Sequence, residues 1–165
     1  LIFTFAVRIV RVSGESMRET LQDQDMLVVL NNWLCGGYEQ GDIVILQRDD
    51  FYGGEPIVKR VIATEGQTVD IDFDAGVVYV DGTALEEPYT REPTWTQEGT
   101  EFPLTVPEGC VFVMGDNRND SDDSRDSALG PVDTRCVLGR ALLLAVPGPT
   151  ADTEQRDWSR IGILN

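Results

Sequence analysis

The 165-residue chain contains no histidine, and Lys59 is its only lysine, because the other twelve of its 13 basic residues are arginines. Histidine is the usual general base at neutral pH and a common zinc ligand, so its absence removes the commonest forms of both kinds of site. A serine nucleophile in this chain needs another base. A lysine in its neutral form is the available side chain.

Positive charge is scarce throughout the sequence, and the formal net charge is −16. A surface that binds nucleic acid needs a cluster of lysines and arginines, so we expect no nucleic-acid partner. The same charge opposes electrostatic attachment to anionic lipid. Any contact with a membrane lipid surface is therefore expected to be apolar.

The cysteines are three in number, Cys35, Cys110 and Cys136, and none forms a C-x-x-C pair. Without histidine they cannot assemble a zinc site, and the acidic residues of segment 115–125 do not follow the calcium-loop spacing. We expect neither a metal nor a cofactor. The cysteines are either three buried free thiols or one disulfide and one free thiol.

The apolar runs are short and rich in valine and isoleucine, and glycine and aspartate separate them. This pattern predicts a mainly β fold of antiparallel sheets. Asp74-Ala75-Gly76 and Asp81-Gly82 are typical hairpin turns. The expected strands lie in residues 25–30, 42–46, 56–63, 68–71, 77–80, 111–114 and 137–146.

The length predicts one domain. We assign residues 1–147 to a catalytic domain with a β-ribbon insertion at about 68–107, in which the proline-containing and charged stretch 86–101 is a loop or part of the ribbon. Residues 148–165 form a C-terminal tail, and its polar first half, 148–157, is expected at the surface. A short helix is expected near 119–129, where serine and aspartate are good N-caps.

Ser16 lies in a turn signal, Ser13-Gly14-Glu15-Ser16-Met17. Gly14 permits a tight turn, which would direct the Ser16 hydroxyl outward and its backbone N–H towards a developing oxyanion. Taken alone, a serine in such a sequence is more often a turn or cap residue.

Lys59 lies in an expected strand, where alternate residues share a face. Ile57 and Val61 are its neighbours on that face. An apolar face disfavours the charged amine and lowers its pKa from the free value of about 10.4. The alternative is a lysine that extends to solvent from an edge strand. Every other basic residue in the chain is arginine, which cannot lose its proton. The single lysine therefore indicates a position that requires the neutral form.

Three segments in this order resemble the serine, lysine and third conserved boxes of bacterial type I signal peptidases: residues 13–21, 58–69 and 115–125. The resemblance extends from about Val12 to Val146. It implies a membrane-associated serine endopeptidase that removes signal peptides from exported preproteins through a Ser-Lys dyad and an acyl-enzyme. It also implies a mainly β fold of the signal-peptidase type.

By position, the resemblance makes Ser16 the nucleophile, Lys59 its general base and Ser121 a hydrogen-bond partner that orients the lysine amine. Gly14 stands where some members add a serine hydroxyl to the oxyanion hole. The chain has Glu19 in place of the family's usual proline, and residues 64–67 depart from its Leu-Pro-Gly-Asp turn. The resemblance also implies two supporting pairs, Asp123 with Arg125 and Asp116 with Arg60.

The resemblance further implies a transmembrane anchor before Leu1 and a catalytic domain on the extracytoplasmic side of the cell membrane. Segment 1–7 is apolar but far shorter than the roughly 20 residues of a spanning helix, and on its own it favours a strand. Three apolar segments could form a rim that contacts the membrane: segment 1–7, Trp33-Leu34, and Trp158 with Ile161, Ile163 and Leu164. The alternative is that these are ordinary core and surface residues.

Two other functions fit parts of the sequence. A self-cleaving repressor-type Ser-Lys protease shares the Ser-Gly-x-Ser-Met turn and the Val-Lys-Arg strand but lacks the Gly-Asp-Asn-Arg segment. A non-catalytic β domain that binds partners would leave the unique lysine unexplained. Loss of the Ser16 hydroxyl separates these classes, because only a binding domain would keep full function.

Overall fold

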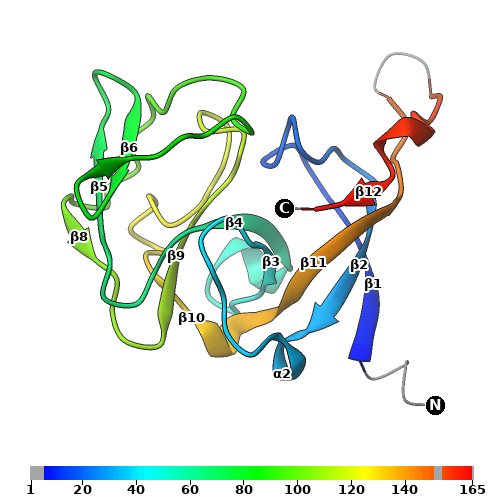
Figure 1. Ribbon diagram of the computed structural model, residues 1–165, viewed down its shortest axis with the longest axis horizontal. Coiled ribbons are helices and arrows are strands. Elements are labelled where there is room, and N and C mark those ends of the chain that lie inside the picture. The colour runs from blue at the N-terminus through cyan, green and yellow to red at the C-terminus, as the bar shows by residue number, and fades with distance from the viewer. Residues whose placement is uncertain (1–5, 151–153, 165) are drawn as a thin grey trace.

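The computed structural model describes residues 6–150 and 154–164, and these form two antiparallel β-sheets (Figure 1). The larger sheet has the order β1-β2-β11-β3-β4-β9-β10, and β12 pairs with β11. Its strands are β1 (Val7–Arg11), β2 (Met26–Asn31), β3 (Ile43–Leu46), β4 (Ile57–Thr64), β9 (Cys110–Met114), β10 (Val132–Asp133), β11 (Val137–Val146) and β12 (Gly162–Ile163). The mainly β, antiparallel prediction is confirmed, and the seven expected strands are all present.

The smaller sheet has the order β7-β6-β5-β8, and all of its strands lie within the region predicted as an insertion. They are β5 (Thr68–Asp72), β6 (Val77–Val80), β7 (Thr83–Ala84) and β8 (Leu104–Thr105). Both predicted hairpins form: Asp72 pairs with Val77 across the first turn and Val80 with Thr83 across the second. Residues 86–101 are a loop.

Strand β4 lies inside the larger sheet, between β3 and β9. Six of its eight residues are buried, so both of its faces are covered. Val58 packs in an apolar cluster with Met17 and Leu21, while Val61 packs in a second cluster on the other face. Lys59 is therefore not on an edge strand, and the alternative of a lysine reaching out from an edge does not hold.

The prediction of a helix near 119–129 is wrong, because that segment is a series of hydrogen-bonded turns. Its short polar side chains bind elsewhere: Asn119 accepts from Trp95 N and Thr96 N, and Ser124 accepts from Val113 N. Such side chains compete with helical backbone bonds. The helical elements given for the described residues are α2 (Asn32–Cys35) and 3₁₀ turns at Tyr52–Gly54, Thr134–Cys136 and Trp158–Arg160.

The segments proposed for an apolar rim lie at opposite ends of β2. Helix α2, with Trp33, follows the last residue of β2, whereas β12 pairs with Leu143–Leu144, opposite the start of β2 (Figure 1). A single continuous rim of Trp33 and Trp158 is therefore wrong, although both rings are exposed. Of segment 1–7, residues 1–5 lie outside the described residues, and Val7 begins a strand.

The tail packs more closely than predicted. Gly148 is buried and donates its N–H to Asp25 Oδ1 at 2.7 Å, and Arg160 forms an ion pair with Asp25 at 2.7 Å. All three cysteines are half-buried free thiols. Within the described residues, no helix has the length and apolarity needed to cross a bilayer.

Candidate active site

Ser16 and Lys59 meet although they lie 43 positions apart in the sequence. Lys59 Nζ donates a hydrogen bond to Ser16 Oγ at 2.7 Å, and among the described residues the amine has no other hydrogen-bond partner. The lysine comes from the interior strand β4, and the serine comes from the turn that links β1 to β2. The two side chains are thus held in contact by the larger sheet.

Burial of its neighbours fixes the Ser16 turn. Met17, which is 1% exposed, and Leu21, which is fully buried, pack against Val58 of β4. Gly14 has φ +86, a conformation that glycine adopts without strain, and its N–H donates to Asp23 Oδ1 at 2.9 Å. Gly14 therefore supports the turn, and its own N–H is already used.

The third segment, residues 115–125, also contacts the Ser16 turn. Asn117 N donates to Ser16 O at 2.9 Å, and Asn117 Nδ2 donates to Glu15 O at 3.2 Å. Gly115 lets the segments approach: a Cβ there would lie 2.1 Å from Ser121 Oγ and 2.4 Å from Ser16 O. Any larger residue at 115 would push Ser16 out of position.

Asp123 and Arg125 form the expected pair, with Arg125 Nη2 donating to Asp123 Oδ2 at 2.8 Å and both side chains fully buried. Burial opposes ionisation, but the hydrogen bond and charge of Arg125 outweigh it and hold the pKa of Asp123 below its usual range. Ser121 Oγ donates to Asp123 Oδ2 at 2.9 Å. The expected hydrogen bond between Ser121 and Lys59 is not formed among the described residues: Lys59 Nζ donates to Ser16 Oγ, and the Ser121 hydroxyl, whose lone pairs could still accept from the amine, donates to Asp123.

Arg60 and Asp116 form the second expected pair, on the face of β4 opposite Lys59. Two guanidinium nitrogens of Arg60 reach the two Asp116 oxygens at 2.8 Å each, and both side chains are buried. Thr20 Oγ1 also donates to Asp116, at 2.6 Å. This pair joins the Ser16 segment, β4 and the third segment at one point.

The Lys59 side chain is 3% exposed, and burial lowers its pKa to about 8. The negative charges of Asp123 and Asp122 act in the opposite direction but are outweighed. A sizeable neutral fraction of the amine therefore exists near physiological pH, as the strand pattern predicted. A neutral amine with a free lone pair can accept the Ser16 hydroxyl proton.

Glu98 is a charged group that the sequence did not single out. Its Oε2 is buried and has no hydrogen-bond partner among the described residues. Burial, together with the charges of Asp122, Asp123 and Asp126, raises the pKa of Glu98 to about 7, against the opposing effect of Arg125. A carboxylate without a partner favours the protonated form.

We predict that Glu98→Gln raises the melting temperature relative to the unmodified chain more at pH 8 than at pH 4.5. Between the unfolded pKa and about 7, only the folded chain holds this proton, so this group lowers the free energy of unfolding as pH rises through that window. Glutamine removes that loss. Calorimetry at both pH values tests the prediction, with the exposed Glu101→Gln as control; equal shifts for the two variants would contradict it.

Ser16 and Lys59 line a cleft of about 310 Å³. Its walls are the Ser16 turn, the segment that enters β4 and residues 120–122. The Ser16 N–H has no acceptor among the described residues, so it is available to an oxygen that develops negative charge in the cleft. An extended peptide that enters this cleft would pass the serine hydroxyl and this N–H together.

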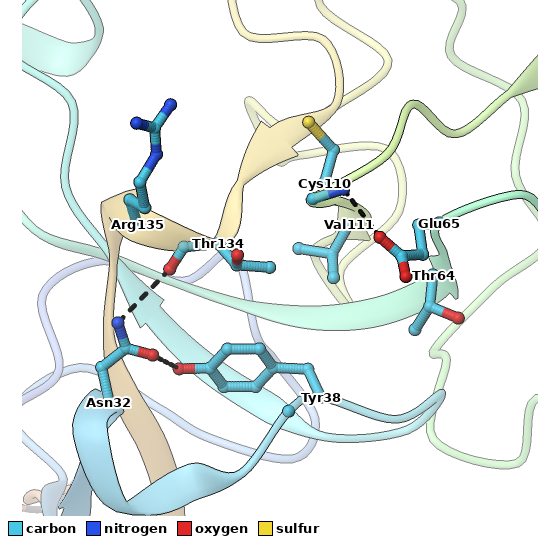
Figure 2. A pocket seen from close by; sticks show the side chains of 10 residues that line it. Asn32, Tyr38, Thr64, Glu65, Cys110, Val111, Thr134 and Arg135 are labelled. Atoms are coloured by element: carbon cyan, nitrogen blue, oxygen red, sulfur yellow. Dashed lines mark hydrogen bonds between the residues drawn. The ribbon is translucent and has the colours of Figure 1, made fainter.

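A second cavity, of about 400 Å³, lies beside Tyr38, Cys110 and Arg135, and none of the candidate site residues line it (Figure 2). Its polar groups are used locally, since Tyr38 donates to Asn32 and Asn32 to Thr134 O. Nothing there matches a catalytic arrangement. Within residues 6–150 and 154–164, no group of cysteine and carboxylate side chains is placed to hold a metal ion.

Comparison with known proteins agrees with this geometry. Residues 1–146 match the family described as signal peptidase, peptidase S26. The chain is 37% identical to the probable signal peptidase I-1 of Synechocystis over 92% of its length and 74% of that protein. It is also 37% identical to signal peptidase I of Bacillus licheniformis, over 89% and 81%.

A solved structure is similar as well. The crystal structure of a signal peptidase I from Enterococcus faecalis matches with a TM-score of 0.51 and 33% identity, covering 63% of this chain and 96% of that one. These matches do not support the repressor-type and non-catalytic alternatives. The chain belongs to the signal peptidase family S26 and is a serine endopeptidase of the signal peptidase I type.

Proposed function

We propose that this chain removes signal peptides from exported preproteins with Ser16 as nucleophile and Lys59 as general base. The observation that carries the proposal is the 2.7 Å contact between Lys59 Nζ and Ser16 Oγ, with the amine buried. The names of the relatives, signal peptidases I, support the substrate class. Ser121, Asp123, Arg125, Arg60, Asp116 and Gly14 act by holding these two side chains in place.

In the proposed reaction, neutral Lys59 takes the Ser16 hydroxyl proton as the oxygen attacks the peptide carbonyl carbon. The Ser16 N–H stabilises the oxyanion of the tetrahedral intermediate. The C–N bond then breaks, Lys59 gives its proton to the leaving amine, and the signal peptide stays esterified to Ser16. Lys59 next takes a proton from water as the water oxygen attacks the ester carbonyl carbon. The bond between that carbon and Ser16 Oγ then breaks, Lys59 returns the proton to Ser16 Oγ, and the signal peptide leaves with a free carboxyl group.

Incubation with a preprotein, followed by mass spectrometry of the products, tests this function. We expect one cut at a site with alanine or another small residue at the first and third positions before the scissile bond, as the family resemblance implies. A close-packed subsite rejects added volume, so leucine or phenylalanine at either position should remove most activity. Equal cleavage of those substrates, or no cleavage at all, would contradict the proposal.

The buried lysine predicts the pH dependence. The active form is neutral, so kcat/KM for a soluble peptide should rise about tenfold per pH unit below a midpoint near 8 and level off above it. The midpoint reports the lowered pKa of Lys59 in the free enzyme. A rate that continues to rise to about pH 10.4, the free lysine value, would show that the base is not buried.

We also propose that the chain works at a membrane surface, on the extracytoplasmic side. Trp158, Ile161 and Ile163 are exposed and lie at the end of β2 from which the Ser16 turn extends. Tryptophan is favoured at the lipid–water interface. We expect salt-resistant binding to vesicles that Trp158→Ser weakens more than Trp33→Ser does. Co-sedimentation over a salt series checks this, and equal effects of the two variants would reject it.

A further inference from the structure

Two adjacent aromatic residues before β4 differ in environment. Phe51 is 8% exposed and packs in the core cluster with Val44 and Val61, whereas Tyr52 is 62% exposed and lines the cleft of Ser16 and Lys59. Their ring centroids are 6.4 Å apart. Phe51 thus anchors the segment, while the Tyr52 ring keeps most of its surface in solvent and contributes little to the core.

The backbone at Tyr52 is in a conformation that suits a different residue. Its φ is +53, and Gly53 and Gly54 follow with φ +66 and +76. A bulky side chain in this left-handed region is an outlier, and such residues occur preferentially at ligand-binding sites. Backbone bonds and Gln47 Nε2, which donates to Gly54 O at 2.7 Å, hold the turn. The turn itself would accept glycine at 52 more readily than tyrosine.

We infer that Tyr52 is a substrate-binding residue, whose ring packs on an apolar side chain of the preprotein lying in the cleft. This inference rests on the proposed function. Tyr52, Pro56 and Ile57 all line the cleft and lie on the segment that leads to Lys59, so the ring adds apolar surface to the cleft. A flat, half-rigid ring gives much contact area for little lost conformational freedom.

The ring serves binding and has no part in the chemical step. Among the described residues no hydrogen bond joins Tyr52 to Ser16 or Lys59, whose side chains bond each other. A contact that is the same in the bound substrate and the transition state changes KM and leaves kcat unchanged. Its loss should therefore appear as weaker binding of the peptide.

The test compares Tyr52→Gly, Tyr52→Asn and Tyr52→Phe on a soluble preprotein-derived peptide, with the melting temperature measured for each. Glycine and asparagine tolerate the left-handed turn, so both variants should melt at or above the temperature of the unmodified chain. We expect a KM about tenfold higher for both, with kcat within about twofold. Tyr52→Phe keeps the ring and should keep the original KM.

Trp33→Asn is the matched control, since Trp33 is 69% exposed but lies outside the cleft, and its KM should not change. An unchanged KM in Tyr52→Gly and Tyr52→Asn, or an equal rise in Tyr52→Phe, would overturn the inference while cleavage by the unmodified chain still supports the proposed function. Failure of the unmodified chain to cut the peptide would instead reject the proposed function.

Discussion

Ser16→Ala and Lys59→Met should each lower kcat for a preprotein by at least about 10³-fold without loss of the fold. Alanine removes the nucleophilic oxygen. Methionine keeps an unbranched apolar stem in the buried site of Lys59 but has no amine. Circular dichroism and thermal melting establish that each variant is folded, and single-turnover assays measure the loss.

The variant that identifies the base is Lys59→Arg. Guanidinium stays protonated at any pH at which the protein is folded, so it cannot take the Ser16 proton. We expect no turnover, even at pH 10. Folded Lys59→Arg or Lys59→Met protein with measurable turnover would show that another group activates Ser16. The double variant Ser16→Ala/Lys59→Met should be no slower than either single variant, because the two residues act as one unit.

The strands were predictable because their side-chain pattern is local. Valine and isoleucine alternate or run together over four to ten residues, and glycine or aspartate marks the turns between them. In the second hairpin, Asp81 and Gly82 have φ +50 and +77, the conformation that this dipeptide favours. The segment 119–129 failed for the converse reason: its side chains bind partners such as Trp95 and Val113 that no local pattern identifies.

Lys59 was predictable because it is the only lysine in the chain, whereas Ser16 is one of several serines and was singled out by its turn motif and by the resemblance. The contacts that hold these two side chains in position were less predictable. The contact of Asn117 with Ser16 joins residues about 100 positions apart, and the need for Gly115 depends on how closely Ser121 and Ser16 approach. Ser121 lies where expected but bonds Asp123. Glu98 and Tyr52 have no sequence signal, because their significance lies in a missing partner and in a backbone angle.

The same local Asp–Arg ion pair occurs twice in the chain, once buried and once exposed. Comparing the two predicts how much burial of the pair contributes to the free energy of unfolding. In Asp123-Ser124-Arg125 and in Asp133-Thr134-Arg135, the arginine Nε and Nη2 donate to the carboxylate two residues earlier. The exposed fractions of the Arg and Asp side chains are both 0% in the first pair, and 89% and 36% in the second. The Asp–Arg geometry is shared, but Asp123 also accepts hydrogen bonds from Ser121 Oγ and Gly115 N, so a difference between the two pairs reports burial together with those bonds.

Asp123→Asn should lower the free energy of unfolding by about 3–5 kcal/mol, because it leaves the Arg125 charge buried without a counter-charge. Asp133→Asn should change it little, since water solvates both partners in that pair. Denaturant unfolding at pH 7 measures both. The double variant Asp123→Asn/Arg125→Met should recover part of the loss, because it removes the uncompensated charge. Equal losses in the two single variants would mean that the hydrogen bonds, and not burial of the charge, determine the cost.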